Sequence, residues 1–277
     1  MSEPPSFEVV ETRTGARAML DHRTGEVMHP LSGPIEEARG LYLQPSRLAE
    51  RLRLGDGGES EPLVLLDVGL GAGSNAVAAW ALSEARAAVA RRLHIVSFDR
   101  TLAALELAVS AEHRAAFGYD GPTLNACAEL LERRRTEGTA TLWRASLGEL
   151  PSTLRAEPPA SADIVYWDPF SPRANPELWN VGAFAALRAL CRDGATVHTY
   201  SGATATRTAL LLAGFAVGLG DVLSPGRQAT VASTRPEDLA TPLDGRWLER
   251  LARSSAPYPP DAPADAFDRI ARLPQFR

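Results

Sequence analysis

The chain of 277 residues contains no lysine, only two cysteines and no long apolar segment. Its 29 basic residues are therefore all arginine, which points to coding bias rather than to a function. No apolar run approaches the roughly 20 residues that a membrane-spanning helix needs. Residues 1–5 lack the basic and apolar regions of a secretory signal. We therefore expect a cytoplasmic protein with no membrane partner.

The few cysteines exclude a disulfide framework and a cysteine-rich metal site. Cys127 and Cys191 lie in apolar segments, and neither they nor the histidines have metal-ligand spacing. A disulfide is rare in a reducing compartment, so we expect two buried thiols and no metal. The net charge of -5 argues against a general RNA-binding surface, although it leaves local arginine patches open.

The chain does contain the pattern of an α/β domain. From residue 63 onward, apolar runs typical of strands alternate with helical segments, which predicts a parallel sheet with helices on both faces. The expected strands are 63–67, 94–99, 140–143, 163–167 and 195–200, and the expected helices are 75–91, 102–114, 123–137, 176–190 and 203–213. Two last strands, 214–219 and 228–233, are expected to form a C-terminal hairpin around a turn at 224–226.

Both ends of the chain differ in pattern from this core. Residues 7–28 alternate and turn at glycines, which predicts a small β-meander, and residues 34–54 have helical spacing. The tail is rich in proline, so we expect a wrapping extension or partial disorder, with one short helical piece around 247–251. The predicted division is an extension at 1–58 that ends in a flexible junction at 55–58, a core domain at 59–234 and a tail at 235–277.

The segment Asp67-Val-Gly-Leu-Gly-Ala-Gly-Ser-Asn75 is the most informative motif. Its glycines, Gly69, Gly71 and Gly73, fit the D/E-x-G-x-G-x-G loop of S-adenosylmethionine-dependent methyltransferases. Glycines allow a ligand to come close, and the helix start behind them offers free N–H groups to a carboxylate. Dinucleotide sites use a similar loop, but here no glycine stands at that motif's last position. Another nucleotide or a plain tight turn are the alternatives.

Two aspartates follow later strands of the predicted sheet. Asp99 ends the second strand, where a carboxylate can accept hydrogen bonds from both ribose hydroxyls of the cofactor. Asp168 follows the fourth strand, and ligands of open α/β sheets bind at the carboxyl ends of strands. We therefore expect Asp67, Asp99 and Asp168 in one crevice. Three prolines stiffen the loop after Asp168, which favours a preformed pocket.

These segments resemble the methyltransferase component of the bacterial tRNA 5-methylaminomethyl-2-thiouridine biosynthesis enzymes. The loop Asp168-Pro-Phe-Ser-Pro-Arg-Ala-Asn-Pro-Glu-Leu-Trp179 is similar to that family's D-G-F-[S/A]-P-x-x-N-P-x-[L/M]-W loop, and the glycine loop to its own. Further similar segments are 25–37, Thr199-Tyr-Ser201 with Arg207, and Ala213-Gly-Phe215, so the resemblance covers roughly residues 10–233. It implies a Rossmann-like class I methyltransferase fold.

The sequence departs from the family pattern at three places. Pro169 replaces the glycine after the loop aspartate, Ala174 replaces a usual lysine, and Ala145-Ser146 replaces the Gly-Asp of the third cofactor motif. Ser146 retains a hydroxyl for the adenine amino group. Pro169, the missing lysine and the acidic net charge favour two alternatives to tRNA as the methyl acceptor, a small-molecule amine or another nucleobase. A non-catalytic S-adenosylmethionine-binding protein is a third possibility.

The resemblance implies methylation of the primary amine of 5-aminomethyl-(2-thio)uridine at the wobble position of tRNA, with S-adenosylmethionine as cofactor. The length leaves no room for the FAD-dependent oxidase domain that often accompanies this family, so such a partner is expected as a separate protein. Asp168 is the expected catalytic residue, as acceptor of the amine proton. The expected cofactor-binding residues are Asp67, Gly69, Gly71, Gly73, Asn75, Asp99 and Ser146, and the expected substrate-binding residues are Glu37, Phe170, Pro172, Asn175 and Tyr200.

Overall fold

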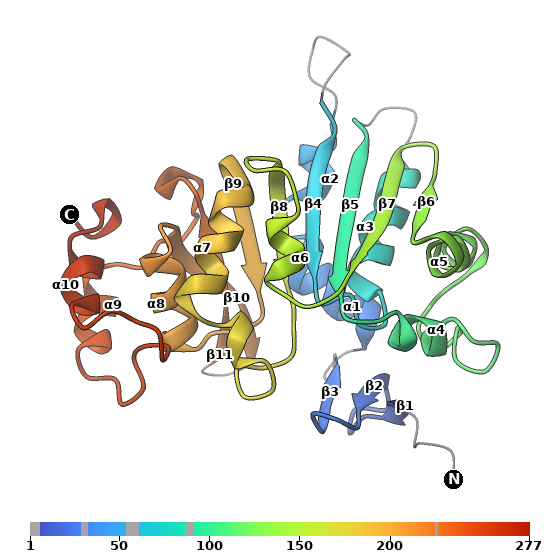
Figure 1. Cartoon of the computed structure of the whole chain (residues 1–277), viewed down its shortest axis with the longest axis horizontal. Helices are drawn as coiled ribbons and strands as arrows, with labels where there is room; N and C mark the ends of the chain where they lie inside the picture. The colour runs from blue at the N-terminus through green and yellow to red at the C-terminus, as the bar shows by residue number, and fades with distance from the viewer. Residues whose placement is uncertain (1–5, 29–32, 54–60, 87–90, 225–226) are drawn as a thin grey trace.

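The computed structural model describes residues 6–28, 33–53, 61–86, 91–224 and 227–277. Within these residues an eight-stranded mixed sheet forms the centre, in the order β10-β11-β9-β8-β4-β5-β7-β6. A separate three-stranded antiparallel sheet lies beyond the carboxyl ends of β4 and β5 (Figure 1). The predicted Rossmann-like α/β fold, with its N-terminal meander and C-terminal hairpin, is confirmed.

The central part of the large sheet is parallel. Its parallel strands are β4 (Leu63–Val68), β5 (Leu93–Asp99), β7 (Thr141–Leu147), β8 (Ala162–Trp167) and β9 (Cys191–Thr199). The hairpin of β10 (Ala216–Ser224) and β11 (Arg227–Ser233) extends one side, with β11 antiparallel to β9. Two of the residues of the predicted turn, 225–226, lie outside the described residues.

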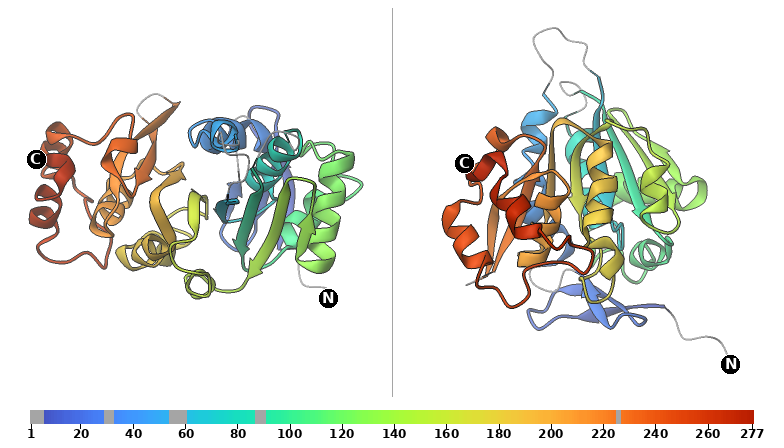
Figure 2. Two further views of the ribbon diagram at one scale, coloured as in Figure 1. Left: turned by 90° about the horizontal axis from the view of Figure 1, so that it is seen from above. Right: turned by 60° about the vertical axis from the view of Figure 1, so that its left-hand side comes forward.

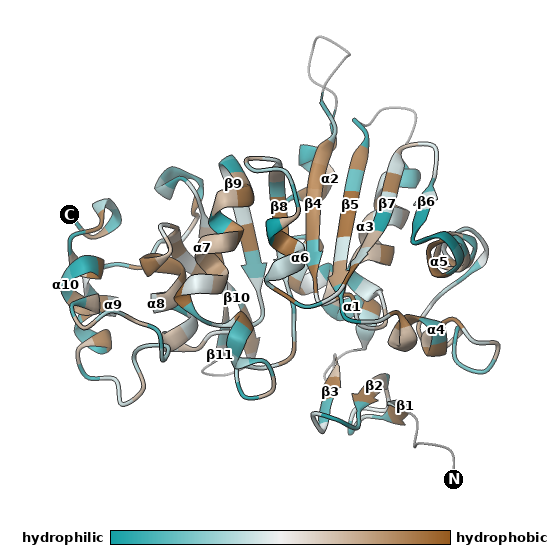
Figure 3. Cartoon of the chain, viewed as in Figure 1, coloured by the Kyte–Doolittle hydropathy of each residue, from teal (hydrophilic) through white to brown (hydrophobic). Residues whose placement is uncertain are grey.

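Helices cover both faces of this sheet, because neighbouring residues of each strand point to opposite sides. In β4, Leu65 packs into one apolar core and Leu66 into the other, and the strand is hydrophobic over most of its length (Figure 3). The first core contains α3 (Ser74–Glu84), α4 (Ala103–Ala108) and α5 (Gly121–Arg133); the second contains α6 (Ser152–Arg155), α7 (Val181–Leu190) and α8 (Thr204–Leu212). Cys127 and Cys191 are free, buried thiols in opposite cores, as expected.

The N-terminal meander consists of β1 (Phe7–Glu11), β2 (Arg17–Asp21) and β3 (Glu26–Met28). The helical segment that follows is not continuous, which corrects the expectation for 34–54. It is divided into α1 (Pro34–Ala38), the π-helix η1 (Arg39–Leu43) and α2 (Leu48–Arg51). Arg47 separates the last two because its φ of 54° is left-handed. The predicted junction at 55–58 lies outside the described residues.

The prediction of one helix over 123–137 is wrong at its C-terminal end. The helix α5 stops at Arg133 because Arg134 takes a left-handed φ of 56°. The next residues form β6 (Arg135–Glu137), an edge strand antiparallel to β7. Thr136 of this strand is buried and donates a hydrogen bond to Glu129. The edge pairing therefore overrides the helical pattern of the sequence.

The tail packs against the end of the sheet, which corresponds to the wrapping extension of the two alternatives expected for it. It contains α9 (Gly245–Leu251), α10 (Ala266–Ala271) and two short 3-10 turns, and it lies beyond the C-terminal hairpin (Figure 2). The ring of Trp247 stacks on that of Phe276, and the side-chain amide of Gln275 bonds both backbone groups of Val217. Within the described residues, no helix has the length and apolar character to cross a membrane.

Phe184 of α7 provides a test of this packing. Its ring is fully buried between Trp167 and Trp179, with ring centroids 5.0 and 6.4 Å away. Phe184→Ala should lower the free energy of unfolding in urea by about 3–5 kcal/mol, because it leaves a cavity in the core. Phe267→Ala is the matched control, since Phe267 is 39% exposed, and it should cost less than about 1 kcal/mol. Equal losses in the two variants would contradict this account.

Candidate active site

The glycine loop after β4 lies against two other segments. Gly69 has a φ of 94°, and a Cβ there would lie 2.6 Å from the carbonyl oxygen of Asp168. Gly71 has a φ of 51°, and a Cβ there would lie 2.9 Å from the sulfur of Met28 in β3. Only glycine combines these backbone angles with such close neighbours. The loop therefore brings β4, the Asp168 loop and the N-terminal meander together.

Gly73 and Asp67 support the glycine loop on the side that faces the protein interior. A Cβ on Gly73, whose φ is 91°, would lie 2.9 Å from the side chain of Leu105. The carboxylate of Asp67 is buried and accepts a 2.7 Å hydrogen bond from the Ser97 hydroxyl. The indole N–H of Trp143 donates to the same hydroxyl at 2.9 Å. Gly73 and Asp67 thus contact the protein interior and do not line the cavity.

A cavity of about 870 Å³ opens at the carboxyl ends of the strands, and its size suits a nucleotide-like ligand. The glycine loop, the Asp168 loop, the meander and β10 all contribute to its wall. The predicted site residues that line it are Gly69, Gly71, Asp99, Asp168, Glu37, Phe170, Asn175 and Tyr200. Those outside its wall are Asp67, Gly73, Asn75, Ser146 and Pro172, the last of which lines a neighbouring cavity.

Asp99 is held at the cavity wall by backbone groups. Its carboxylate accepts hydrogen bonds from the N–H of Gly71 at 2.9 Å and of Arg100 at 2.7 Å. Burial raises the pKa of Asp99, while the N–H groups of Gly71, Arg100 and Thr101 oppose that rise. A carboxylate offers about four lone-pair positions, so these backbone bonds leave capacity for a ligand hydroxyl. The glycine cradle and this acceptor fit the ribose of S-adenosylmethionine.

The carboxylate of Asp168 is held by two side chains from other elements. The hydroxyl of Tyr42, in η1, donates to Oδ1 at 2.5 Å, and the amide of Asn75, in α3, donates to Oδ2 at 2.8 Å. Burial and the neighbouring Asp168 carboxylate raise the pKa of Tyr42 well above its ordinary value. The tyrosine therefore remains a proton donor, and Asp168 is fixed as an oriented acceptor within the cavity.

The rest of the Asp168 loop is anchored on both sides. From the meander, the Glu26 carboxylate accepts from the N–H of Ser171 at 2.9 Å and also from its hydroxyl. From the end of β9, the Tyr200 hydroxyl donates to the carbonyl of Pro169 at 3.0 Å. These bonds, together with the prolines, make the loop a rigid wall.

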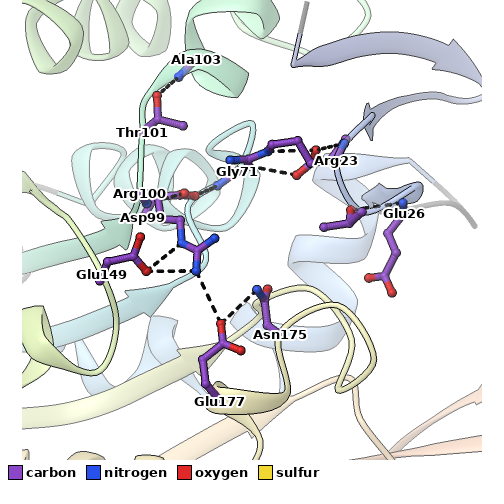
Figure 4. Close-up of polar contacts among 12 residues, drawn as sticks. Arg23, Glu26, Gly71, Asp99, Arg100, Thr101, Ala103, Glu149, Asn175 and Glu177 are labelled. Atoms are coloured by element: carbon purple, nitrogen blue, oxygen red, sulfur yellow. Dashed lines mark hydrogen bonds and ion pairs between the residues drawn. The ribbon is translucent and has the colours of Figure 1, made fainter.

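The end of the Asp168 loop is linked to the end of β5 by charged side chains. The loop turns through the 3-10 helix η2 (Pro176–Leu178). Figure 4 shows the Arg100 side chain between Glu149, at 3.0 Å, and Glu177, at 3.6 Å. The Asn175 amide donates to Glu177 at 3.3 Å. The predicted substrate residue Asn175 is thus positioned by a carboxylate of its own loop.

The charged residues of the cavity wall are mostly carboxylates. Its acidic residues are Asp21, Glu26, Glu36, Glu37, Asp99, Asp168, Glu177 and Asp221, and its basic residues are Arg23 and Arg100. Both arginines form ion pairs within the wall, Arg23 with Asp21 at 3.1 Å and Arg100 with Glu177. The cavity therefore presents a field that favours a cationic ligand, such as a sulfonium or an ammonium group.

Some of these positions were not apparent from the sequence. Tyr42 lies in a segment whose leucines suggested an apolar helix, and 126 residues separate it from Asp168. Glu26 and Met28 lie in the family-like segment 25–37, but the sequence assigned neither of them a role at the site. Ser146, in contrast, was predicted from the sequence as a cofactor-binding residue but does not line the cavity. It lies in β7, where it pairs with Phe98 of β5.

Comparison with known proteins agrees with this geometry. A sequence model of the family "S-adenosyl-L-methionine-dependent methyltransferase" matches residues 127–235. The "tRNA 5-methylaminomethyl-2-thiouridine biosynthesis bifunctional protein MnmC" of Burkholderia vietnamiensis is 30% identical over 210 residues, which are 72% of this chain and 31% of that protein. The protein of the same name from Polaromonas naphthalenivorans is 31% identical over 222 residues, 76% of this chain and 33% of that protein. The chain spans about a third of the length of these curated relatives.

Solved structures also show similarity to this chain. The structure of MNMC2 from Aquifex aeolicus matches 97% of this chain and 85% of that chain, with a TM-score of 0.72 and 26% identity. A spermidine synthase from Thermotoga maritima matches 84% of this chain and 70% of that chain, with a TM-score of 0.51 and 12% identity, and so shares the fold alone. These comparisons confirm the resemblance found in the sequence and the expected cofactor, S-adenosylmethionine.

Asp99 provides a test of the cofactor site. Asp99→Asn should raise the dissociation constant of S-adenosylmethionine about 10- to 100-fold in calorimetric titration, because hydrogen bonds to a charged group are worth about 1.5–3 kcal/mol. Burial raises the pKa of Asp99, so acidification should protonate it earlier than an ordinary aspartate and weaken binding by the wild type. The variant should lose this pH dependence. As a control, Asp268→Asn removes an exposed carboxylate of α10; equal affinities in the two variants would exclude the role of Asp99.

Proposed function

We propose that this S-adenosylmethionine-dependent methyltransferase, a relative of the bifunctional tRNA-modification proteins, methylates the primary amine of 5-aminomethyl-(2-thio)uridine at the wobble position of tRNA. The observation that carries the proposal is the Asp168 carboxylate, fixed by Tyr42 and Asn75 in a cavity that also contains the cofactor-type glycine loop. The similarity to MNMC2 over 97% of the chain supports the choice of acceptor.

The cofactor's place follows from the wall of the cavity. Gly69 and Gly71 leave backbone space for it, and Asp99 would accept the ribose hydroxyls. Asp67 and Gly73 would act indirectly, since they hold the loop from behind. Bound S-adenosylmethionine supplies a methyl group already activated by its sulfonium, so the protein's task is to position the acceptor and manage its proton.

Asp168 would accept the proton that the amine must lose. The amine attacks only in its neutral form, so one proton must leave it, and a carboxylate oxygen within hydrogen-bond reach can accept that proton. Tyr42 and Asn75 each occupy one carboxylate oxygen from the side of the protein. They would thereby orient the carboxylate of Asp168 toward the acceptor. No further catalytic group is required by this scheme.

The acceptor base would lie between the Asp168 loop and the opposite wall. Phe170 is half-buried at the cavity and offers a ring for an extruded base to stack on. Tyr200 and Asn175 would close the same side, with Pro172 at the margin. Glu37 of α1, which is only 8% exposed, would form the opposite wall. The carboxylate-rich lining would attract the aminomethyl group while it is still protonated.

A second candidate acceptor has one observation in its favour. The excess of carboxylates in the wall suits a small-molecule amine as well as an aminomethylated base. Unlike tRNA, such an acceptor would need no contact with nucleic-acid phosphates. Methyl transfer to a panel of small amines, compared with transfer to tRNA, separates the two candidates.

The wider setting of the enzyme is part of the proposal. The relatives are named as bifunctional, and this chain spans about a third of them. We therefore place the methyl transfer in residues 59–234, with 1–58 and 235–277 as its extensions. A separate FAD-dependent oxidoreductase would supply the aminomethyl group on the same tRNA, and both would act in the cytoplasm.

The test of the proposal is transfer of a labelled methyl group to tRNA that carries the unmethylated aminomethyl group. The wild type should label it, and Asp168→Asn should lower turnover at least about 100-fold, the usual contribution of a general base. The variant should bind S-adenosylmethionine almost as the wild type does. Asp268→Asn, at an exposed position of α10, should turn over normally. Near-normal turnover by Asp168→Asn would rule out the role of Asp168, and no labelling by the wild type would refute the acceptor.

A further inference from the structure

A second cavity, of about 530 Å³, lies beside the main one and differs from it in charge. The two cavities share Ser171, Tyr200 and Leu223, so the Asp168 loop and the end of β9 form the boundary between them. The second cavity is lined by Arg207 and Arg250, and by no carboxylate among the described residues. A basic cavity thus opens directly next to an acidic one.

Arg207, in α8, is 9% exposed and has no acidic partner in the described part of the chain. Its Nε donates to the Thr230 hydroxyl at 3.0 Å, and its Nη2 donates to the carbonyl of Gln228 at 3.0 Å. All of its bonds therefore go to neutral acceptors, and Nη1 donates to none of the described residues. A buried cation without a counter-charge is costly unless an anion joins it.

Burial and the charge of Arg250 lower the pKa of Arg207 to about 10. The guanidinium nevertheless stays charged at neutral pH. Within the described residues, no carboxylate lies close enough to oppose this shift. The protein thus maintains two like charges at the wall of one cavity, an arrangement that an anionic ligand would relieve.

Other groups at this cavity also favour an anion. Arg250, in α9, is exposed, and no ion pair involves it in the described part of the chain. The residues before α8, Gly202 and Ala203, line the cavity, and the helix has no side-chain cap. No side chain therefore caps the first N–H groups of this helix, which begins next to the cavity. The backbone at Gly202 is fixed against β11, since a Cβ there would lie 2.3 Å from the carbonyl oxygen of Gln228.

We propose that the cavity between Arg207 and Arg250 binds a backbone phosphodiester of the RNA strand whose target nucleotide occupies the main cavity. The inference rests on the proposed function and specifies how the acceptor is held. The planar guanidinium groups match the oxygens of a phosphate, and RNA-binding proteins take most of their affinity from such contacts. The cavity lies one loop away from Asp168, so a nucleotide extruded toward Asp168 would carry its phosphate toward the arginines.

The test measures binding of an unmodified anticodon stem-loop RNA at several salt concentrations. Arg250→Gln is the informative variant, because Arg250 is exposed and its loss breaks no bond in the described residues. The dissociation constant for the RNA should rise about five- to tenfold at about 0.1 M salt. The slope of log affinity against log salt should become shallower by about 0.7–1, the value for one lost phosphate contact.

Arg246→Gln is the matched control, since Arg246 is an exposed arginine of the same helix that lines neither cavity. It should leave the affinity and the salt slope unchanged. Equal behaviour of the two variants would overturn the phosphate site, and so would absence of RNA binding by the wild type. If the wild type methylates tRNA but Arg250→Gln and Arg246→Gln bind RNA equally well, the proposed function stands and only the phosphate site is refuted. Arg250-dependent binding without methyl transfer would support the site and contradict the proposed function.

Discussion

The structure of the site depends on how one carboxylate, that of Asp168, is fixed. Asp168 follows β8, its hydrogen-bond partners come from η1 and α3, and its backbone rests on Gly69 after β4. Three segments that are distant in the sequence, around Tyr42, at 69–75 and at Asp168, must therefore reach their places together before this group is oriented. Tyr42 and Asn75 are neutral donors, so they orient the Asp168 carboxylate without adding a positive charge beside it.

This constraint explains why the additions to the core sheet matter. The meander supplies Glu26 and Met28, which fix the Asp168 loop and cover the glycine loop. At the other side, the tail helix α9 supplies Arg250 and the C-terminal hairpin supplies the backbone that positions Arg207. The common sheet would hold the cofactor, while the added segments would give the two neighbouring cavities their opposite charges and hence their choice of acceptor.

Much of this was predictable from the sequence because it follows from local pattern. The alternation of apolar runs predicted the sheet, and the spacing of its glycines predicted the loop at Gly69 and Gly71. The contributions that were missed are non-local. Nothing near Tyr42 in the sequence indicates that its hydroxyl meets Asp168, and the end of α5 depends on the left-handed Arg134 and an edge strand rather than on helical spacing.

The most direct measurement of the central claim is a double-mutant cycle on single-turnover methyl transfer, with Tyr42→Phe, Asp168→Asn and the combined variant. If Tyr42 acts by orienting Asp168, its loss should slow the wild type about tenfold and have almost no further effect once Asp168 is replaced. Single effects that simply multiply in the combined variant would contradict the account, because Tyr42 would then act independently of the carboxylate that it bonds.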